Sequence, residues 1–556
     1  MKYFQFARLA SALLLVSAAV AARSGQPVPD LPQYFPTCPA PQPYAPWQPV
    51  GGAFVNARAS VAWNGRDYAV LYTDGNDAAL HFRRFFADGT PAAPDVTVNT
   101  GLVVSSFYPS LAWNGSGYGA AFTAFAGGKF QTFFIGLDSG GGKLNGPTIV
   151  SNPSYDTADP VIAWSGSGYA VAWTFKFTAT DYDIYGALLN PAGAITTPTF
   201  VVSGPIQLQQ APAITWSQGA GRYQVVWQDR RSSQDEIYGR QLAQTGGMTT
   251  ELNLVTSAGT NAIAPALADN GDGIGLTWSD SRDGNNEIYF ARMAAGGAKL
   301  GTDLRLTIDA ATSNASQIVW TGSEYGIFWH DYRGGNYDLW FQRVTAAGAT
   351  PGGNVQLTAT GGANFPAAAF GRFDYLLTGS GSAGVNFVLP VGCGTDTTPP
   401  TCPGNFLAYN ITGTTATIAW LPSDDPESDI AYYQVYKDNA PLAKTSDTYY
   451  AATGLGLSST SNFSLRPVNA GQLSNAACST SIYVKTNSSL TLTMNKSTPD
   501  AVLNWTDAGF NSYNVFRGND PRVMSQIGAT PTLTAPDANA LSNSLSYFYS
   551  VDNPGP

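Results

Sequence analysis

Three copies of a charged motif are the part of this 556-residue chain best equipped for chemistry. In each copy an Asp lies two residues after a Trp, an Arg lies two residues after the Asp, and an acidic residue follows seven positions after the Asp. The tryptophans lie 51 residues apart in both intervals. The copies are Trp227-Gln-Asp229-Arg-Arg231 with Glu236, Trp278-Ser-Asp280-Ser-Arg282 with Glu287, and Trp329-His-Asp331-Tyr-Arg333 with Asp338.

The motif has two interpretations. Because the guanidinium is a planar fork that can pair with two carboxylates, Asp229, Arg231 and Glu236 could staple one hairpin, and an exposed pair of this kind contributes at most about 1 kcal/mol. The same hairpins could present polar groups and aromatic planes to a sugar. A staple should point between sheets, whereas a binding site should face solvent. The candidate ligand-binding residues are Asp229, Arg231, Asp280, Arg282, Asp331, Arg333, His330 and Tyr332.

The sequence predicts no catalytic residue and no cofactor. Most glycosidases need two facing carboxylates, whereas repetition at one period places each Arg of the motif at the same radius on its own sheet. His330 and Asp331 are adjacent on a predicted strand, so their side chains should point to opposite faces and cannot form a relay. An enzyme therefore stays as the alternative interpretation.

No metal site is predicted either. His81 and His330 are the two histidines of the chain, which excludes a His-rich site. Two oxygen-rich segments do not follow the calcium-loop pattern, so we expect solvated turns there. They are Asp280, Asp283, Asn285 and Glu287, and Asp424, Asp425, Glu427 and Asp429.

The charged motif belongs to a unit of about fifty residues that recurs seven times. Its core is an apolar strand, a Gly-rich turn ending in Tyr, and a second apolar strand. The clear copies are Trp63 to Tyr68, Trp113 to Tyr118 and Trp164 to Tyr169, and degenerate copies begin near Trp216, Asp269, Trp320 and Phe370. One such sheet cannot bury both of its faces, so radial stacking is required.

We therefore predict an all-β chain with a seven-bladed β-propeller over residues 48–393. The seventh copy has no evident fourth strand, and the segment Pro49–Asn56 resembles the last strand of a repeat. Closing the ring with this N-terminal strand, beside the strand around Phe387, would leave no free edge.

The repeat region, about residues 48 to 392, resembles secreted bacterial propellers of the sialidase-repeat and TolB-like kind. The WD40 signature and a true sialidase Asp-box are both absent. After a Pro-rich linker at 394–400, residues 401–486 resemble a fibronectin type III domain, with Trp420 on one strand and Phe463 where a Tyr is usual. Residues 487–556 look like a second, short copy. The resemblance implies that these modules are spacers.

The first residues read as an export signal. Lys2 and Arg8 precede an apolar run, Leu9 to Val20, and Ala19-Val20-Ala21 fits a cleavage site, so we expect a signal peptide at 1–21 and an extension at 22–47. The run is too short to span a bilayer comfortably. The net charge of −10 and the lack of a Lys/Arg stripe argue against a nucleic-acid partner.

Four cysteines are consistent with an oxidising compartment and allow three pairings. We favour Cys38–Cys393, which would join the two ends of the ring, and Cys402–Cys478, which would tie the first strand of a sandwich to its last.

Together these features predict an exported, noncatalytic recognition, adhesion or scaffold protein, secreted or at the cell surface. Its propeller would bind extracellular carbohydrate or a surface protein, with no membrane span. The alternative is a propeller glycoside hydrolase or lyase that acts on extracellular polysaccharide.

Overall fold

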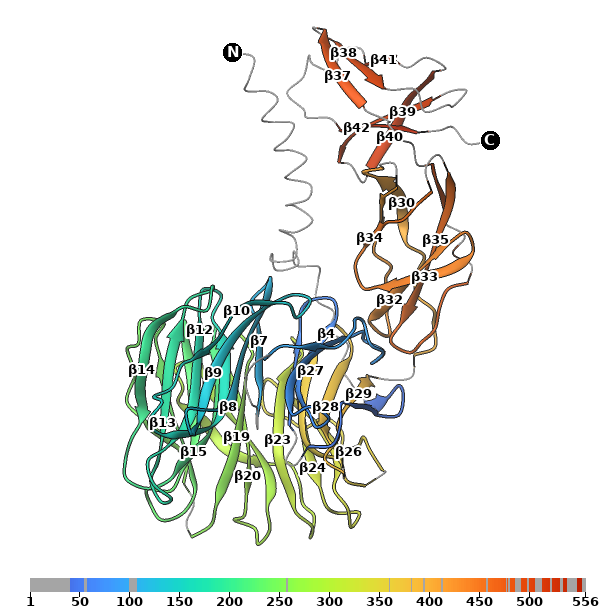
Figure 1. Ribbon diagram of the computed structural model, residues 1–556. Coiled ribbons are helices and arrows are strands. Elements are labelled where there is room, and N and C mark those ends of the chain that lie inside the picture. The colour runs from blue at the N-terminus through green and yellow to red at the C-terminus, as the bar shows by residue number, and fades with distance from the viewer. Residues whose placement is uncertain are drawn as a thin grey trace. The chain divides into compact units, whose positions relative to one another are not determined.

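The computed structural model describes residues 41–484 with short gaps, and strand backbone alone between 485 and 552. The gaps are 55–57, 100–107, 257–258, 360, 382, 394–395, 412–413, 457–458, 477 and 479–480. The chain divides into two compact units, Met1–Asp396 and Thr397–Pro556 (Figure 1). Every regular element in the described part is a β-strand, and nothing in it is a helix able to cross a bilayer.

Seven antiparallel sheets make up the described part of the first unit. The first three four-stranded sheets are β3 (Ala59–Trp63), β4 (Tyr68–Asp74), β5 (Ala79–Phe85) and β6 (Val96–Thr97); β7 (Ser110–Trp113), β8 (Gly117–Ala126), β9 (Lys129–Asp138) and β10 (Lys143–Ile149); and β11 (Asp156–Trp164), β12 (Tyr169–Lys176), β13 (Tyr182–Leu189) and β14 (Ile195–Ser203). The next three are β15 (Gln209–Ser217), β16 (Arg222–Asp229), β17 (Glu236–Leu242) and β18 (Leu252–Val255); β19 (Ala262–Asp269), β20 (Gly273–Asp280), β21 (Glu287–Ala294) and β22 (Lys299–Arg305); and β23 (Ser313–Trp320), β24 (Glu324–Asp331), β25 (Asp338–Thr345) and β26 (Val355–Gln356). The five-stranded sheet has β27 (Asn364–Phe370), β28 (Tyr375–Ser380) and β29 (Asn386–Gly392) with β1 (Gln42–Pro43) and β2 (Gln48–Val50).

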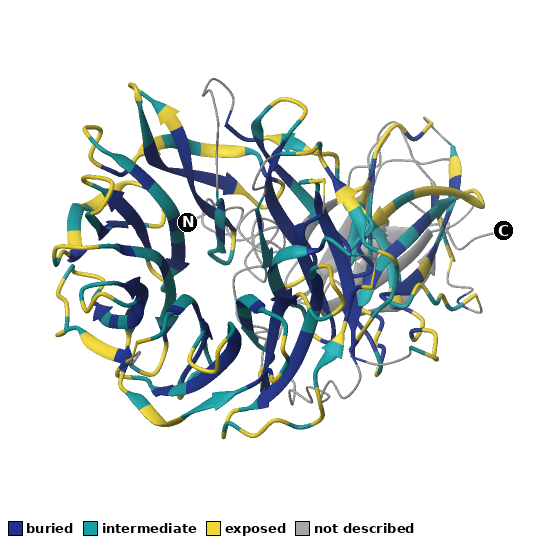
Figure 2. Ribbon diagram, turned by 90° about the horizontal axis from the view of Figure 1, so that it is seen from below, coloured by how far each residue is buried: buried dark blue, intermediate teal, exposed yellow. Residues whose placement is uncertain are grey.

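The seven sheets lie around a common axis in a propeller-like arrangement (Figure 2). The first strand of each sheet contacts the first strand of the next, and β27 of the last sheet contacts β3 of the first. N-terminal residues complete the five-stranded sheet: Pro49 pairs with Phe387, and Phe54 N–H donates to the carbonyl of Gly384 at 2.9 Å. Part of the expected extension also takes part, because Gln42 pairs with Gly392.

The Trp–turn–Tyr motif links neighbouring sheets. In the first copy Gly65 has φ +94°, a left-handed conformation that suits glycine, and the Trp63 and Tyr68 rings lie 4.6 Å apart. The Tyr68 hydroxyl donates to the carbonyl of Asp374 at 2.7 Å, which joins the first sheet to the last. Similarly, the Tyr118 hydroxyl accepts a 3.0 Å bond from Asn64 of the preceding sheet. The Tyr223 hydroxyl likewise donates to the carbonyl of Gly168 at 2.7 Å, so in these three copies the motif fastens its sheet to the previous one.

The core lies between the sheets. The second strands β16, β20 and β24 are almost wholly buried, which matches their continuous apolar sequences (Figure 2). Among the largest fully buried side chains are Trp173, Trp227, Trp278 and Trp329, which occupy equivalent positions on four successive sheets.

The described part of the second unit is also all β. Its sheets contain β30 (Gly404–Tyr409), β31 (Ala416–Leu421) and β34 (Tyr449–Ala452); and β32 (Ile430–Lys437), β33 (Ala440–Thr445), β35 (Thr460–Asn469) and β36 (Ser481–Lys485). Two further sheets contain β37 (Leu492–Ser497), β38 (Asp500–Trp505) and β41 (Thr534–Asp537); and β39 (Tyr513–Asp520), β40 (Val523–Thr530) and β42 (Phe548–Asp552).

The cysteine prediction is confirmed for one pair. Cys402 and Cys478 form a disulfide with a Cα–Cα distance of 5.3 Å. Cys393 is buried and disulfide-bonded, but Cys38 and the expected signal peptide lie outside the described residues. The pairing of Cys38 with Cys393 therefore stays a prediction.

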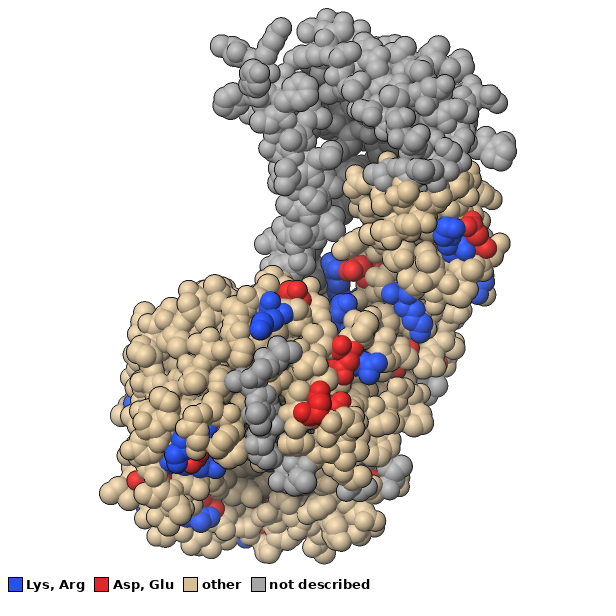
Figure 3. Space-filling model, viewed as in Figure 1, with Lys and Arg blue, Asp and Glu red and all other residues tan. Residues whose placement is uncertain are grey.

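Charged side chains are sparse on the surface. On the face seen in Figure 3, acidic and basic groups are intermixed and form no continuous basic stripe.

Candidate functional site

The three predicted Asp–Arg hairpins have the same geometry in β16–β17, β20–β21 and β24–β25, and we call these three sheets the stapled sheets. Asp229, Asp280 and Asp331 each end a second strand, and each is fully buried. The Asp229 carboxylate accepts the Trp227 indole N–H at 2.8 Å and the Arg231 backbone N–H at 2.9 Å.

The Arg side chain closes the staple. Arg231 Nε and Nη2 donate to the two Asp229 oxygens at 2.9 and 2.5 Å, and Arg333 binds Asp331 in the same forked manner at 2.9 and 2.7 Å. Arg282 makes one such bond to Asp280, at 2.5 Å, and another to Asp303 at 2.9 Å. Buried carboxylates bound in this way have few acceptor sites left for a ligand.

The other side of each Arg packs on an aromatic ring of the returning strand. The guanidinium carbons of Arg231, Arg282 and Arg333 lie 4.1, 4.6 and 3.9 Å from the ring centroids of Tyr238, Tyr289 and Trp340. The Trp, Asp, Arg and aromatic residues thus form one stacked unit, which explains their strict spacing.

The acidic residue of the returning strand has a different role from the one predicted. Glu236 pairs in register with Asp229 but accepts from Asn253, while Arg231 binds Glu251 instead at 2.8 Å. Asp338 likewise accepts from Thr358 at 2.9 Å and from Gly361 N–H at 3.1 Å. These carboxylates fasten the outer strand and the following loop, because their side chains point toward the sheet edge.

His330 and Tyr332 occupy contrasting positions. His330 is buried, and its Nδ1 accepts the Phe365 N–H at 3.1 Å. Burial and, to a smaller extent, the charge of Arg58 together lower the pKa of His330 to about 4, so the ring is neutral at physiological pH. Tyr332 is 45% exposed and packs edge-to-face against Tyr337 with ring centroids 5.0 Å apart. Of this pair, Tyr332 is the side chain that a ligand can reach.

The acidic segments offered as calcium candidates bind protein donors. Glu287 accepts from Arg305 at 2.9 Å and from Thr307, while Asp283 accepts from the Tyr289 hydroxyl. In the second unit Glu427 accepts the backbone N–H groups of Thr397 and Thr398, each at 2.8 Å. The sequence predicted solvated turns here, whereas in the structure these carboxylates accept hydrogen bonds from protein groups.

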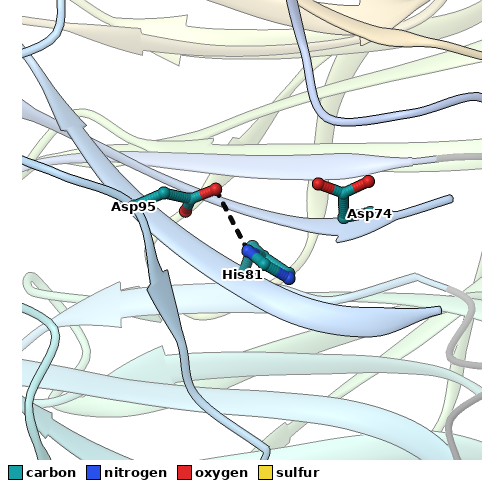
Figure 4. Close-up of side chains that lie close together, drawn as sticks. All are labelled: Asp74, His81 and Asp95. Atoms are coloured by element: carbon teal, nitrogen blue, oxygen red, sulfur yellow. Dashed lines mark hydrogen bonds and ion pairs between the residues drawn. The ribbon is translucent and has the colours of Figure 1, made fainter. Parts of the chain in front are cut away.

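A histidine cluster on the sheet of β4 and β5 was not predicted (Figure 4). His81 lies between two carboxylates, with Nδ1 3.0 Å from Asp95 and Nε2 3.0 Å from Asp77. The hydrogen bond to Asp95 raises the pKa of His81 to about 9, although burial opposes the change. Asp74 lies close enough to complete a three-ligand cation set. A histidine whose two nitrogens both donate to carboxylates cannot also ligate a metal, so an imidazolium ion pair fits the geometry better.

A second group, which we call the inner ring, lies just before the first strand of each sheet or near the start of that strand. One half-buried residue stands at the equivalent position of each sheet, followed by a buried residue. The inner ring is Arg58, Tyr108, Asp159, Ala211, Ala264, Ala315 and Phe365. In five of the sheets a register shift brackets this residue, and the six positions from Tyr108 onward have φ between 49° and 63°.

The inner ring lies at the same end of the sheets as the stapled hairpins. Gln209, two residues before Ala211, pairs with Asp229, and Ala262 and Ser313 pair with Asp280 and Asp331 in the same way. A left-handed conformation costs a non-glycine residue roughly 1–2 kcal/mol, and such positions cluster at functional sites. Bulges of this kind also redirect the side chain.

Large side chains of the inner ring lie together around Arg58. Its guanidinium carbon is 4.1 Å from the Tyr108 ring centroid and 4.5 Å from that of Phe365. Asp159 accepts a 3.4 Å hydrogen bond from Thr174, and burial raises the pKa of its carboxyl although Arg58 and Lys176 oppose this. The other three positions are alanines, so one side of the ring carries functional groups and the opposite side carries methyl groups.

Sequence reasoning missed the inner ring because it searched for identical residues at the repeat period. The available signal was a variable residue in front of Pro109, Pro160, Pro212, Pro265 and Pro366, at about fifty-residue spacing. Variation within an otherwise strict repeat marks positions that the fold itself leaves free.

No family model matches the chain. It is 30% identical over 172 residues to Exoglucanase B of Cellulomonas fimi, covering 28% of this chain and 15% of the relative. It is 34% identical over 95 residues to chitinase Chi52 of Paenibacillus xylanexedens, covering 17% of this chain and 18% of the relative. The chain thus spans less than a fifth of the length of either curated relative.

Among solved structures, the GH43 endo-arabinanase from Bacillus licheniformis is 14% identical with a TM-score of 0.29. The match covers 44% of this chain and 95% of that chain. Structural similarity this low supports no argument about activity.

Proposed function

We propose that this chain acts on extracellular polysaccharide as a glycoside hydrolase or lyase, with the inner ring as its substrate site. The observation that carries the proposal is the gathering of Arg58, Tyr108, Asp159 and Phe365 at one end of the first unit. The substrate class is supported by the two curated relatives, whose names are those of an exoglucanase and a chitinase. This favours the enzyme alternative over the noncatalytic role that the sequence suggested.

The proposed architecture is a seven-bladed β-propeller over residues 48–393, a linker at 394–400, and two fibronectin type III-like spacers at 401–486 and 487–556. The cyclic contacts of seven sheets and the pairing of β2 with β29 support the propeller. The paired sheets joined by the Cys402–Cys478 disulfide support a sandwich.

Asp159 is the carboxyl of the inner ring best placed to exchange a proton. A general acid needs a pKa raised toward the working pH, and burial moves the Asp159 carboxyl in that direction. The stapled carboxylates are poor candidates, since Asp229 and its equivalents are held by indole and guanidinium donors.

Recognition without catalysis is the second candidate function. It is favoured by the saturation of the stapled carboxylates, which leaves no facing pair of free carboxylates within the described hairpins. In this case the aromatic and polar groups of the inner ring would bind carbohydrate without cleaving it.

The deciding experiment incubates the full-length exported chain with cellulose, chitin, arabinan, xylan and pectic polysaccharides and measures new reducing ends and retention on each polymer. We expect product release from at least one polymer, and Asp159→Asn should abolish release with little change in retention. The control is Asp272→Asn, an exposed carboxyl in the turn between β19 and β20. Retention without any product would leave the noncatalytic function, and neither product nor retention would exclude both.

A further inference from the structure

Arg58 stands out within the inner ring because it forms no ion pair with a described residue, although Asp159 lies near enough to feel its charge. Among the described residues it has no hydrogen-bond acceptor and no ion-pair partner, whereas each stapled Arg binds at least one carboxylate. A half-buried guanidinium is normally paired, because leaving it unpaired inside a protein is costly. The N–H groups of Arg58 could therefore bind an external anion.

Two aromatic rings pack against Arg58 and limit which part of its guanidinium can contact a ligand. Tyr108 and Phe365 lie 4.1 and 4.5 Å from its central carbon and so cover the planar group. The N–H donors of a guanidinium lie along the edge of its plane. An edge of paired N–H groups matches a planar carboxylate, which can accept two parallel hydrogen bonds.

The surroundings of Arg58 favour a sugar acid over a small anion. Asp159 lies near enough to feel the charge of Arg58, and burial raises the pKa of its carboxyl although Arg58 opposes this. His330 is held neutral, so Arg58 is the cation of the inner ring itself, while Lys176 acts on the Asp159 carboxyl from β12. Across the ring, Ala211, Ala264 and Ala315 occupy the equivalent positions with the smallest side chains that have a Cβ.

We propose that Arg58 binds the carboxylate of a uronic acid residue, so that the polysaccharide recognised by the inner ring is an acidic one. This inference rests on the proposed function, since it names the substrate class of the same site. Because the chain carries a net charge of −10, long-range attraction does not assist an acidic polymer, and recognition depends on this local guanidinium.

The test measures binding of the full-length chain by calorimetry to oligosaccharides that contain galacturonate or glucuronate, each beside its partner with the carboxyl reduced to an alcohol. We expect the acidic form to bind at least about tenfold more tightly, as one charge-assisted bidentate contact implies. Arg58→Gln should remove that preference, and Arg58→Lys should restore part of it. The matched control is Arg66→Gln, an exposed arginine in the turn at the other end of β3.

Thermal melting of each variant verifies that it is folded. Equal binding of the acidic and reduced sugars, or a preference that survives Arg58→Gln in a folded variant, would overturn the uronate site while leaving the proposed function standing. If no sugar of either kind binds and no polysaccharide is cleaved, the proposed function fails and the uronate site fails with it.

Discussion

The stapled sheets and the inner ring occupy the same end of the first unit, yet they use their arginines in opposite ways. Arg231, Arg282 and Arg333 repeat at strict spacing, and each is bound to a buried carboxylate. Arg58 has no equivalent arginine on the other six sheets and no carboxylate partner among the described residues. Strict repetition therefore marks residues that hold the fold together, and variation at an equivalent position marks residues available for a ligand.

The largest expected loss in the free energy of unfolding comes from removing a stapled carboxylate. Asp280→Ala leaves the Trp278 indole N–H and the Arg282 guanidinium without their shared acceptor in a buried site. We expect the free energy of unfolding to fall by about 3–5 kcal/mol, the usual cost of breaking a buried charge pair. Denaturant unfolding followed by tryptophan fluorescence measures it.

The matched control is Asp272→Ala, in an exposed turn of the same sheet, which should change stability by less than about 0.5 kcal/mol. Similar losses for the two variants would contradict the staple.

A second comparison removes one arginine from each region. Arg282→Gln should lower the free energy of unfolding by about 1–3 kcal/mol, because it leaves Asp280 buried with a missing donor. Arg58→Gln should cost less than about 1 kcal/mol or even stabilise, since an unpaired cation is removed. Urea unfolding of the two variants side by side checks this, and a larger loss for Arg58→Gln would show that Arg58 is structural.

A third prediction tests whether a staple can be built where it is absent. The sheet of β12 and β13 keeps Trp173 paired with Tyr185 but has Phe175 and Phe177 at the Asp and Arg positions, and the buried Trp173 indole N–H has no acceptor. Phe175→Asp alone should destabilise by about 2–3 kcal/mol through loss of aromatic packing.

Adding Phe177→Arg should recover about 1–2 kcal/mol of that loss through the new ion pair. A double-mutant cycle measured by thermal unfolding gives the coupling. Zero coupling would mean that the staple needs the shorter hairpins of the stapled sheets.

The smallest expected effect is the change of stability with pH. His81 has its pKa raised to about 9 by Asp95 and Asp77, so its ion pairs contribute fully below the ordinary value of 6.5 and are lost as the pH rises through about 9. We expect about 1 kcal/mol of stability to disappear between those limits, because Asp77 is half exposed and screened by solvent. The Asp331 staple has no such dependence at alkaline pH, because hydrogen bonds from Arg333, Trp329 and Ser313 overcome its burial and keep its pKa low.

Unfolding curves recorded from pH 6 to pH 10 measure the loss, and His81→Gln should make stability less dependent on pH in that window. A loss of the same size in His81→Gln would assign the effect to other groups.

The sequence by itself determined the all-β class, the seven repeats and the pairing of Asp with Arg in the repeated hairpins. It could do so because a pattern such as Trp63 to Tyr68 performs a local task, which is to make a turn and pack a Trp ring on a Tyr ring, and the chain repeats it. The Cys402–Cys478 pair was also accessible, since these residues flank the segment that folds into the paired sheets.

Only the tertiary structure decided how the charged groups are used. Whether Asp229 faces solvent or the protein interior depends on the neighbouring strands, and the structure buries it under Trp227 and Arg231. The inner ring joins Arg58 to Phe365, residues separated by almost the whole length of the first unit, and closure of the ring of sheets brings them together. Periodicity predicts which residues are equivalent, but distances across a closed ring are set by the packing of all the sheets at once.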